Sequence, residues 1–186
     1  MGLDRNFDQL CPPEKLNSLH QIENFDSGNT QLDEWLKRRA LKNESEGASR
    51  TYVVCDRQAV IAYYCLANGA IAQTAATGKV RRNMPDPIPV MVIGRLAVDR
   101  NWQGSGIGRA LLRDAILRTL QAAEIAGIRA ILVHAISEDA KQFYQRCGFT
   151  ISPIDPMTLM VKVSDAIASR YSQTLVALVG GLLAHD

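Results

Sequence analysis

The sequence predicts an α/β (α+β) fold formed by a single domain. A length of 186 residues suits one hydrophobic core. An amphipathic helical pattern and then a β-hairpin pattern occupy residues 29–66. A strand, a glycine-rich run, a helix, a strand and a second helix follow later in the chain, which is the order of an α/β unit.

The composition is that of an ordinary folded protein, with 47% hydrophobic and 22% charged residues. The net charge of +2 is too small to indicate a nucleic-acid partner by itself. The four cysteines form no C-x-x-C pair and only three histidines are present, so we expect free thiols and no metal site. Asp4, Arg5 and Asp8 stand where a signal peptide would need apolar residues, so we expect a cytoplasmic protein that does not enter a membrane.

From Asn29 the pattern changes to that of an amphipathic helix, which ends near Gly47. Thr30 can cap it, with Asp33 at the capping-box position, and apolar residues recur at spacings of three and four. Residues 1–28 have the pattern of one or two strands that run into a turn. The outward face of the helix carries Lys37, Arg38 and Lys42. These cations are either solvated surface charges or phosphate contacts, and the pattern leaves both interpretations open.

Two β-rich runs, 51–55 and 59–66, are predicted to form a hairpin through residues 56–58. Residues 78–90 contain three prolines and two adjacent arginines, so we expect a loop without regular structure. The apolar tail at 171–186 is shorter than the ~20 residues that cross a bilayer. We therefore expect a domain at 1–170 and a tail whose role the sequence does not assign.

The pattern that indicates function lies in the second half of the chain. A strand at 90–98 precedes the glycine-rich run, and a helix at 107–126 follows that run. A strand at 128–135 leads to a second helix, which Ser137 can cap and which runs through Cys147 to Gly148. The final predicted strand covers residues 157–163.

The glycine-rich run, residues 103–108, is suited to binding a diphosphate. Glycines allow backbone N–H groups to converge on phosphate oxygens, and the helix that follows adds the positive end of its dipole. A P-loop would need Lys and then Ser or Thr after the last glycine, but Arg109 and Ala110 follow Gly108. A Rossmann fold would have this run in its first βα unit, whereas here it follows a hairpin. The sequence thus predicts a different phosphate-bearing cofactor.

The same run resembles a known family. Gln103, Gly106 and Gly108 match the motif Q/R-x-x-G-x-G/A, and residues 143–149 match an FYxxxGF ending. Through these motifs residues 50–163 resemble the GCN5-related N-acetyltransferase (GNAT) superfamily. The resemblance implies the acetyltransferase fold, a central mixed and mostly antiparallel sheet with splayed strands flanked by helices, and acetyl-CoA as cofactor. The residues that it assigns to the cofactor are Leu96, Ala97, Val98, Gln103, Gly104, Ser105, Gly106, Ile107, Gly108, Arg109, Ser137, Ala140 and Phe143.

Acetyl transfer from a thioester needs a neutral amine, a stabilised oxyanion and a proton for the departing thiolate. The resemblance implies Tyr144 as the catalytic acid, because a phenol keeps its proton at neutral pH. The alternative is a tyrosine that only packs beside Phe143. A backbone N–H near residues 96–98 would stabilise the oxyanion. His134, Glu138 and Asp139 are the candidate bases, and the sequence does not choose among them.

Residues 32–36, 49–53 and 94–98 are also similar to acetyltransferase toxins of type II toxin–antitoxin systems. This resemblance implies acetylation of the α-amino group of aminoacyl-tRNA, a block of translation, a ribbon-helix-helix antitoxin and a homodimer. The residues that could bind tRNA phosphates are Arg81, Arg82, Arg95, Lys37 and Arg38. Two alternatives remain: an N-acetyltransferase for a protein N-terminus, a polyamine or an antibiotic, and a non-catalytic acyl-CoA-binding regulator.

Overall fold

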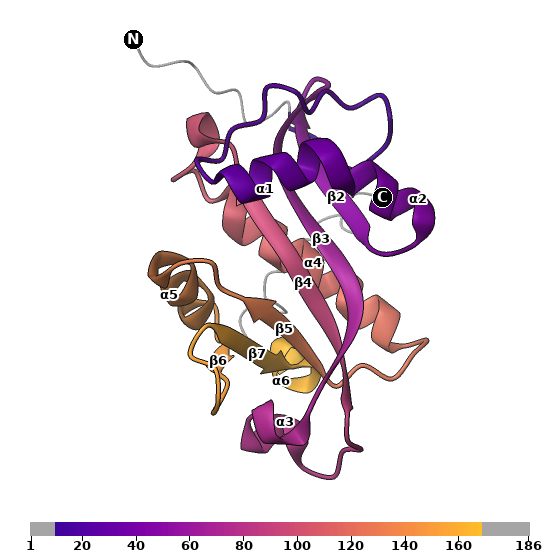
Figure 1. Ribbon diagram of the computed structural model, residues 1–186, viewed down its shortest axis with the longest axis vertical. Helices are drawn as coiled ribbons and strands as arrows, with labels where there is room; N and C mark the ends of the chain where they lie inside the picture. The colour runs from indigo at the N-terminus through magenta and orange to yellow at the C-terminus, as the bar shows by residue number, and fades with distance from the viewer. Residues whose placement is uncertain (1–9, 169–186) are drawn as a thin grey trace, which may run out of the picture. The chain divides into compact units, whose positions relative to one another are not determined.

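The computed structural model describes residues 10–168 and divides into two compact units. Unit 1 contains the residues up to 67 and residues 93–115, and unit 2 contains residues 68–92 and those from 116 onward. The described strands form a seven-stranded sheet with the order β1-β2-β3-β4-β5-β7-β6 (Figure 1). The pairs β1–β2, β2–β3, β5–β7 and β6–β7 are antiparallel, and helices accompany both units. The predicted α/β class with a mostly antiparallel sheet is confirmed.

The ends of the chain limit two predictions. The tail at 171–186 and the start of the predicted domain lie outside the described residues, so the boundaries of that domain stay a prediction. No helix within residues 10–168 is long and apolar enough to span a membrane.

The helical segment near the N-terminus begins one residue earlier than predicted. Asn29 is its N-cap, and the Asn29 Oδ1 accepts hydrogen bonds from the N–H groups of Gln31 (3.0 Å) and Leu32 (3.2 Å). The predicted cap by Thr30 is wrong, because Asn29 has the extended backbone of a cap and Thr30 is already helical. Asp33 does not complete a capping box, since its carboxylate accepts from the N–H and hydroxyl of Ser27.

The segment is one run of three parts. These are α1 (Thr30–Trp35), the π-helical turn η2 (Leu36–Ala40) and α2 (Leu41–Glu46). It ends at Gly47 as predicted, where a left-handed φ of +76° favours glycine.

The predicted hairpin forms with a tighter turn. The strands are β2 (Arg50–Asp56) and β3 (Ala59–Ile71), so only two residues connect them and β3 is five residues longer than expected. The short strand β1 (Glu14–Lys15) pairs with β2 on its other side.

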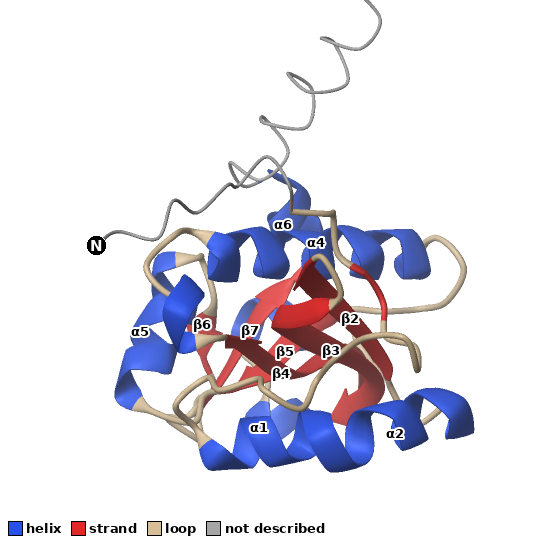
Figure 2. Ribbon diagram, turned by 90° about the horizontal axis from the view of Figure 1, so that it is seen from above, coloured by secondary structure: helices blue, strands red, loops and turns tan. Residues whose placement is uncertain are grey.

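Two neighbouring tyrosines of β3 fix the helices on opposite faces of unit 1. Tyr63 donates to the carbonyl of Leu32 (2.7 Å) and stacks on Trp35, so it anchors α1. Tyr64 points the other way, and its hydroxyl donates to Asp114 in α4 (Ile107–Ala123). Within this unit, α1 and α2 therefore lie on one side of the strands and the first turns of α4 on the other (Figure 2).

The expectation of an irregular loop at 78–90 is wrong at both ends. After η3 (Gln73–Ala75), residues Gly78–Arg81 form the short helix α3, and β4 (Ile88–Val98) already includes Pro89. Arg129 explains both departures. Its guanidinium donates to the carbonyls of Lys79, Val80 and Arg82, which a single helical turn leaves unpaired, and its N–H donates to the carbonyl of Pro89. An arginine 49 residues away in sequence was not recognisable as that partner.

The remaining elements of unit 2 follow the prediction more closely. β5 (Ala130–His134) pairs with β7 (Thr158–Lys162), and β6 (Thr150–Ile151) pairs with β7 as well. Ser137 caps α5 (Glu138–Arg146) by accepting from the N–H of Ala140 (3.1 Å), as predicted. α6 (Val163–Ala168) is the last described helix. The core beneath these elements is apolar and includes Ile88, Val90, Leu132 and Met160.

The corrected cap gives a direct stability test. Asn29→Ala removes the acceptor for two first-turn N–H groups, so we expect a loss of about 1 kcal/mol in the free energy of unfolding. Thr30→Ala is the matched control and should change the free energy of unfolding by less than about 0.5 kcal/mol. Urea titration followed by circular dichroism measures both. A larger loss for Thr30→Ala than for Asn29→Ala would contradict the assignment.

Candidate functional site

The glycine-rich run has the backbone that close approach of a ligand requires. Gly104 and Gly106 have φ values of +74° and +88°, which other residues rarely adopt. Apart from the glycine itself and its two chain neighbours, no described residue has an atom within 4 Å of the position that a Cβ would take at either glycine. The space above this backbone is therefore open, and α4 begins directly after it at Ile107. Open backbone at a helix N-terminus fits a diphosphate.

The side chain of Gln103 does not point into that open space. Its amide Nε2 donates to the carbonyls of Ser27 and Val98, both at 2.9 Å. The motif glutamine thus ties the glycine-rich run to the end of β4 and to the turn before α1. The Ser105 hydroxyl is also used locally, since it donates to the carbonyl of Trp102. The hydrogen-bond donors of both side chains are thus already used within the protein.

Asp99 is a site residue that the sequence did not reveal. Its carboxylate is 8% exposed and accepts from the N–H groups of Asp26 (3.1 Å) and Asn101 (2.9 Å). Its own N–H donates to the carbonyl of Ile61 (2.8 Å). These bonds fix the short helix η4 (Arg100–Trp102), which leads into the glycine-rich run. The only signal in the sequence was an aspartate directly after an apolar strand.

Unit 1 therefore brings together most of the predicted cofactor residues. Leu96, Ala97 and Val98 form the last three positions of β4, and Ala97 is buried. Gly104 to Gly108 follow after η4, and Arg109 lies exposed in the first turn of α4.

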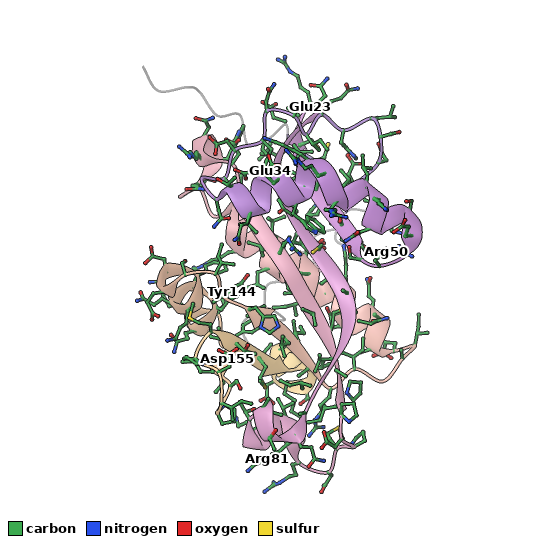
Figure 3. All side chains as sticks on the ribbon, viewed as in Figure 1. Glu23, Glu34, Arg50, Arg81, Tyr144 and Asp155 are labelled. Atoms are coloured by element: carbon green, nitrogen blue, oxygen red, sulfur yellow. The ribbon has the colours of Figure 1, made fainter. Side chains whose placement is uncertain are left out.

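Tyr144 belongs to unit 2, together with the other predicted residues of α5. Its side chain is 7% exposed and packs against Phe143 and Phe149, with ring centroids 5.2 and 5.6 Å apart (Figure 3). Two aromatic neighbours restrict the direction of the phenol. Ser137 and Ala140 lie at the start of the same helix.

All three candidate bases are exposed, but their neighbours differ. Glu138 and Asp139 are exposed in the first turn of α5, and Glu138 pairs with Lys141 (3.3 Å). His134 is the last residue of β5, and its Nδ1 lies 2.8 Å from the Thr158 hydroxyl oxygen. Of the three, His134 is thus the one whose ring is oriented by a hydrogen bond with a neighbouring strand.

The predicted tRNA contacts fall into two groups. Arg81 and Arg82 are exposed at the end of α3 (Figure 3) and line an open pocket of about 720 Å³. That pocket is also lined by the cations Lys79, Arg129 and Lys162 and by one acid, Asp165. The other group lies in unit 1. Lys37 and Arg38 are exposed on η2, Arg38 is paired with Glu34, and the Arg95 guanidinium lies 4.5 Å from the ring centre of Trp35.

One cluster of potential metal ligands satisfies itself by hydrogen bonds. Ligand atoms of Glu14, His20 and Cys55 lie within 4.8 Å of one another. The N–H of Asn17 donates to Nδ1 of His20 (3.0 Å), so Nε2 carries the ring proton and donates to Glu14 (3.1 Å). Burial raises the pKa of the Cys55 thiol to about 11, which keeps the thiol protonated. The cluster therefore gives no reason to revise the prediction of no metal.

Comparison with known proteins establishes the family. Residues 47–151, more than half of the chain, match the acetyltransferase (GNAT) domain. The chain belongs to the GNAT acetyltransferase family, and the predicted family, fold and enzyme class are confirmed.

The chain is more specifically similar to toxins. It is 49% identical to a tRNA-acetylating toxin of Mycobacterium tuberculosis (strain ATCC 25618 / H37Rv), over 84% of this chain and 94% of the relative. It is 26% identical to the toxin AtaT in a complex with acetyl-methionyl-tRNAfMet, with a TM-score of 0.77 over 84% of this chain and 96% of AtaT. The Y144F mutant of AtaT, bound to the C-terminus of the antitoxin AtaR and to acetyl-CoA, gives 26% identity and a TM-score of 0.74, over 87% of this chain and 97% of that one.

The glycine-rich run can be tested without any assay of catalysis. Gly106→Ala forces a side chain onto a backbone with φ of +88°, so we expect a loss of roughly 1–2 kcal/mol in stability. If the loop relaxes to avoid this strain, its N–H groups diverge and the affinity for acetyl-CoA falls, by roughly tenfold for each 1.4 kcal/mol lost. Calorimetric titration and thermal unfolding measure the two effects. Gly127→Ala is the control, because Gly127 has open space and no positive φ. Unchanged affinity for acetyl-CoA in Gly106→Ala would contradict the binding of its diphosphate by the glycine-rich run.

Proposed function

We propose that this protein transfers the acetyl group of acetyl-CoA to the α-amino group of an aminoacyl-tRNA, and that it acts as the toxin of a type II toxin–antitoxin system by blocking translation. The observation that carries this proposal is the 49% identity, over most of both chains, to a toxin that acetylates tRNA. The likeness to AtaT in complex with an acetylated aminoacyl-tRNA supports the same acceptor.

Acetyl-CoA supplies the acetyl group as a thioester, whose carbonyl carbon is open to attack by an amine. The backbone of residues 104–109 would hold its diphosphate, because the positive-φ glycines leave that backbone accessible at the start of α4. Leu96, Ala97 and Val98 would hold the pantetheine arm through their backbone. Ser137, Ala140 and Phe143 would line the thioester end. Gln103 keeps the loop in place through its two carbonyl partners.

Tyr144 is the proposed general acid. A phenol is a hydrogen-bond donor that remains protonated at neutral pH, so it can give a proton to the departing sulfur. The rings of Phe143 and Phe149 hold the tyrosine ring in α5. A backbone N–H near Ala97 is the proposed donor to the carbonyl oxygen that gains charge during transfer.

The pocket at α3 is the proposed contact with tRNA phosphates. Lys79, Arg81, Arg82 and Lys162 bring four cations to one open surface, while Asp165 is the acid there. The guanidinium of Arg129 donates hydrogen bonds to the carbonyls at α3 and so positions the neighbouring arginines. Lys37 and Arg38 on η2 and Arg95 at β4 remain further proposed contacts. Arg95 and Arg38 already have partners in Trp35 and Glu34, so they would contribute less.

The remaining proposals concern assembly and place of action. The solved complexes of AtaT with its antitoxin AtaR support an antitoxin partner for this chain as well. We propose a ribbon-helix-helix antitoxin, a homodimeric toxin, a single acetyltransferase domain at 1–170 and a cytoplasmic location. Translation, the process that the toxin would stop, takes place in that compartment.

The acid role of Tyr144 has a specific kinetic signature. Tyr144→Phe keeps the aromatic packing and removes the donor, so we expect the rate of acetyl transfer to charged tRNA to fall by about 10²–10⁴-fold with little change in acetyl-CoA affinity. Transfer of radiolabelled acetyl to acid-precipitable charged tRNA measures the rate. Tyr52→Phe, in β2, is the matched control and should stay close to the wild-type rate. A full rate in Tyr144→Phe would remove the acid role, and wild-type protein that leaves charged tRNA unmodified would remove the proposed substrate.

The α3 pocket predicts a change in salt dependence. Removing one phosphate contact by Arg81→Ala or Arg82→Ala should weaken tRNA binding and reduce the slope of log affinity against log salt by about 0.7–0.9. Filter binding at several salt concentrations measures the slope. Lys15→Ala removes an exposed cation of β1 and should leave the slope unchanged. If all three variants behave alike, the pocket does not bind tRNA.

A further inference from the structure

A hydrogen-bonded chain of three side chains in unit 2 has no role in the function proposed above. His134 ends β5 and is directly paired with Thr158 in β7. The His134 Nδ1 lies 2.8 Å from the Thr158 hydroxyl oxygen, and that hydroxyl lies 2.6 Å from Oδ2 of Asp155. The other carboxylate oxygen of Asp155 accepts from the N–H of Met157 (2.9 Å). Each group in this chain thus has a fixed neighbour.

The direction of the hydrogen bonds follows from the carboxylate. Hydrogen bonds from the Thr158 hydroxyl and the Met157 N–H lower the pKa of Asp155, so at neutral pH it is ionised and can only accept. The single proton of the Thr158 hydroxyl therefore points to Asp155. Thr158 must then accept from His134, which places the ring proton on Nδ1 and leaves the lone pair of Nε2 unprotonated. A carboxylate and a hydroxyl thus select the tautomer in which Nε2 can accept a proton.

His134, which is exposed, also lines an open pocket whose size and chemistry suit a small ligand. The cavity has a volume of about 240 Å³. Its walls are mostly apolar and come from β3, β4 and β5, with Ile71, Val90, Val92 and Leu132 among them. The titratable residues in its lining are His134 and Asp155. Its volume is below the range typical of pockets for drug-sized ligands, and apolar walls beside a carboxylate suit an uncharged amino-acid side chain with its α-ammonium.

We propose that His134 is the general base of the acetyl transfer, and that it takes a proton from the α-ammonium of an aminoacyl group whose uncharged side chain enters this cavity. This inference rests on the proposed aminoacyl-tRNA acetylation. Thr158 and Asp155 are positioning residues, because they act only through the imidazole. Thr158 lies in β7, and Asp155 lies in the connection between β6 and β7. Both face the imidazole ring of His134, and Asp155 is the charged residue of the two. Its negative charge favours both the approach of the ammonium and the imidazolium that results.

With these roles, the proton transfers of the reaction balance. One proton of the α-ammonium passes to Nε2 of His134 and then to solvent. The neutral nitrogen forms its bond to the acetyl carbon while the carbon–sulfur bond breaks, and the sulfur takes the proton of Tyr144. The nitrogen gives up a second proton, which replaces the one that Tyr144 lost. The products are the acetylated amine, the free thiol and one released proton.

The tautomer can be measured in the protein alone. In ¹⁵N-labelled protein, NMR correlation spectra should show His134 with a protonated Nδ1 and an unprotonated Nε2 at neutral pH. Thr158→Val removes the acceptor for that proton and should give a mixture of tautomers, whereas Thr158→Ser keeps the hydroxyl and should retain the wild-type pattern. A wild-type ring protonated on Nε2 would overturn the inference.

The kinetic test separates a base from a structural residue. His134→Gln should lower kcat/KM by about 10²–10³-fold near neutral pH. The value of kcat/KM should recover as pH rises past roughly 7.7–8.0, where an α-amine loses its own proton. Thr158→Val should give a smaller loss that Thr158→Ser does not show. His20→Gln, the matched control in unit 1, should keep the wild-type rate and profile.

The outcomes distinguish this inference from the proposed function. Wild-type protein that acetylates charged tRNA, together with a His134→Gln variant of unchanged rate and pH profile, overturns the base while leaving the function in place. Wild-type protein without this activity ends the proposed function first. Circular dichroism and acetyl-CoA binding would reveal whether His134→Gln fails to fold. In that case the His134 tautomers and the transfer rates of Thr158→Val and Thr158→Ser decide whether His134 is the base.

Discussion

The buried carboxylate of Asp99 is the constraint on which the cofactor-binding part of this protein depends. A carboxylate with 8% exposure must have hydrogen-bond donors, because an unpaired buried charge is costly. Its donors are the N–H groups of Asp26 and Asn101, one from the turn before α1 and one from η4. The partners therefore hold two segments distant in sequence in a single arrangement. Gln103 adds two more bonds in the same region, and the glycine-rich run that follows begins from a fixed point.

The proposed roles use different features in each unit. Unit 1 contains the residues proposed to hold the diphosphate, at the end of β4, the positive-φ glycines and the first turn of α4, and they would act mainly through their backbone. Unit 2 contains the side chains proposed to donate or accept protons, Tyr144 on α5 and His134 at the end of β5. Elements β3, β4 and α4 each have residues in both units, so the chain joins them by continuous secondary structure.

Local patterns in the sequence predicted the elements whose causes are local. The end of the first helix at Gly47, the Ser137 cap and the glycine-rich run follow from residue types within a few positions of each feature. The helix α3 escaped prediction because its stabilising partner, Arg129, is far away in sequence. The cap of α1 was misplaced by one residue, since Asn29 and Thr30 are both capable of capping and only the backbone decides between them.

In the candidate site, too, the sequence predicted features with local causes and missed those that depend on long-range contacts. Motif resemblance was sufficient for Tyr144 and the glycines, whose roles stay proposals here. Asp99 and the tautomer of His134 depend on contacts between residues 73 and 24 positions apart, and no spacing pattern encodes them. Resemblance also named Gln103 as a cofactor contact, whereas the structure uses its side chain to hold the loop. Long-range hydrogen bonds thus account for most of what the sequence did not predict.

The most direct test of this account identifies the acetylated atom. Total charged tRNA is incubated with the protein and acetyl-CoA, digested with nuclease, and its aminoacyl-adenosines are analysed by tandem mass spectrometry. Aminoacyl-adenosines that carry one added acetyl group on the α-nitrogen are expected only when both protein and acetyl-CoA are present. Aminoacyl-adenosines that remain unmodified, while the protein acetylates another amine, would contradict it.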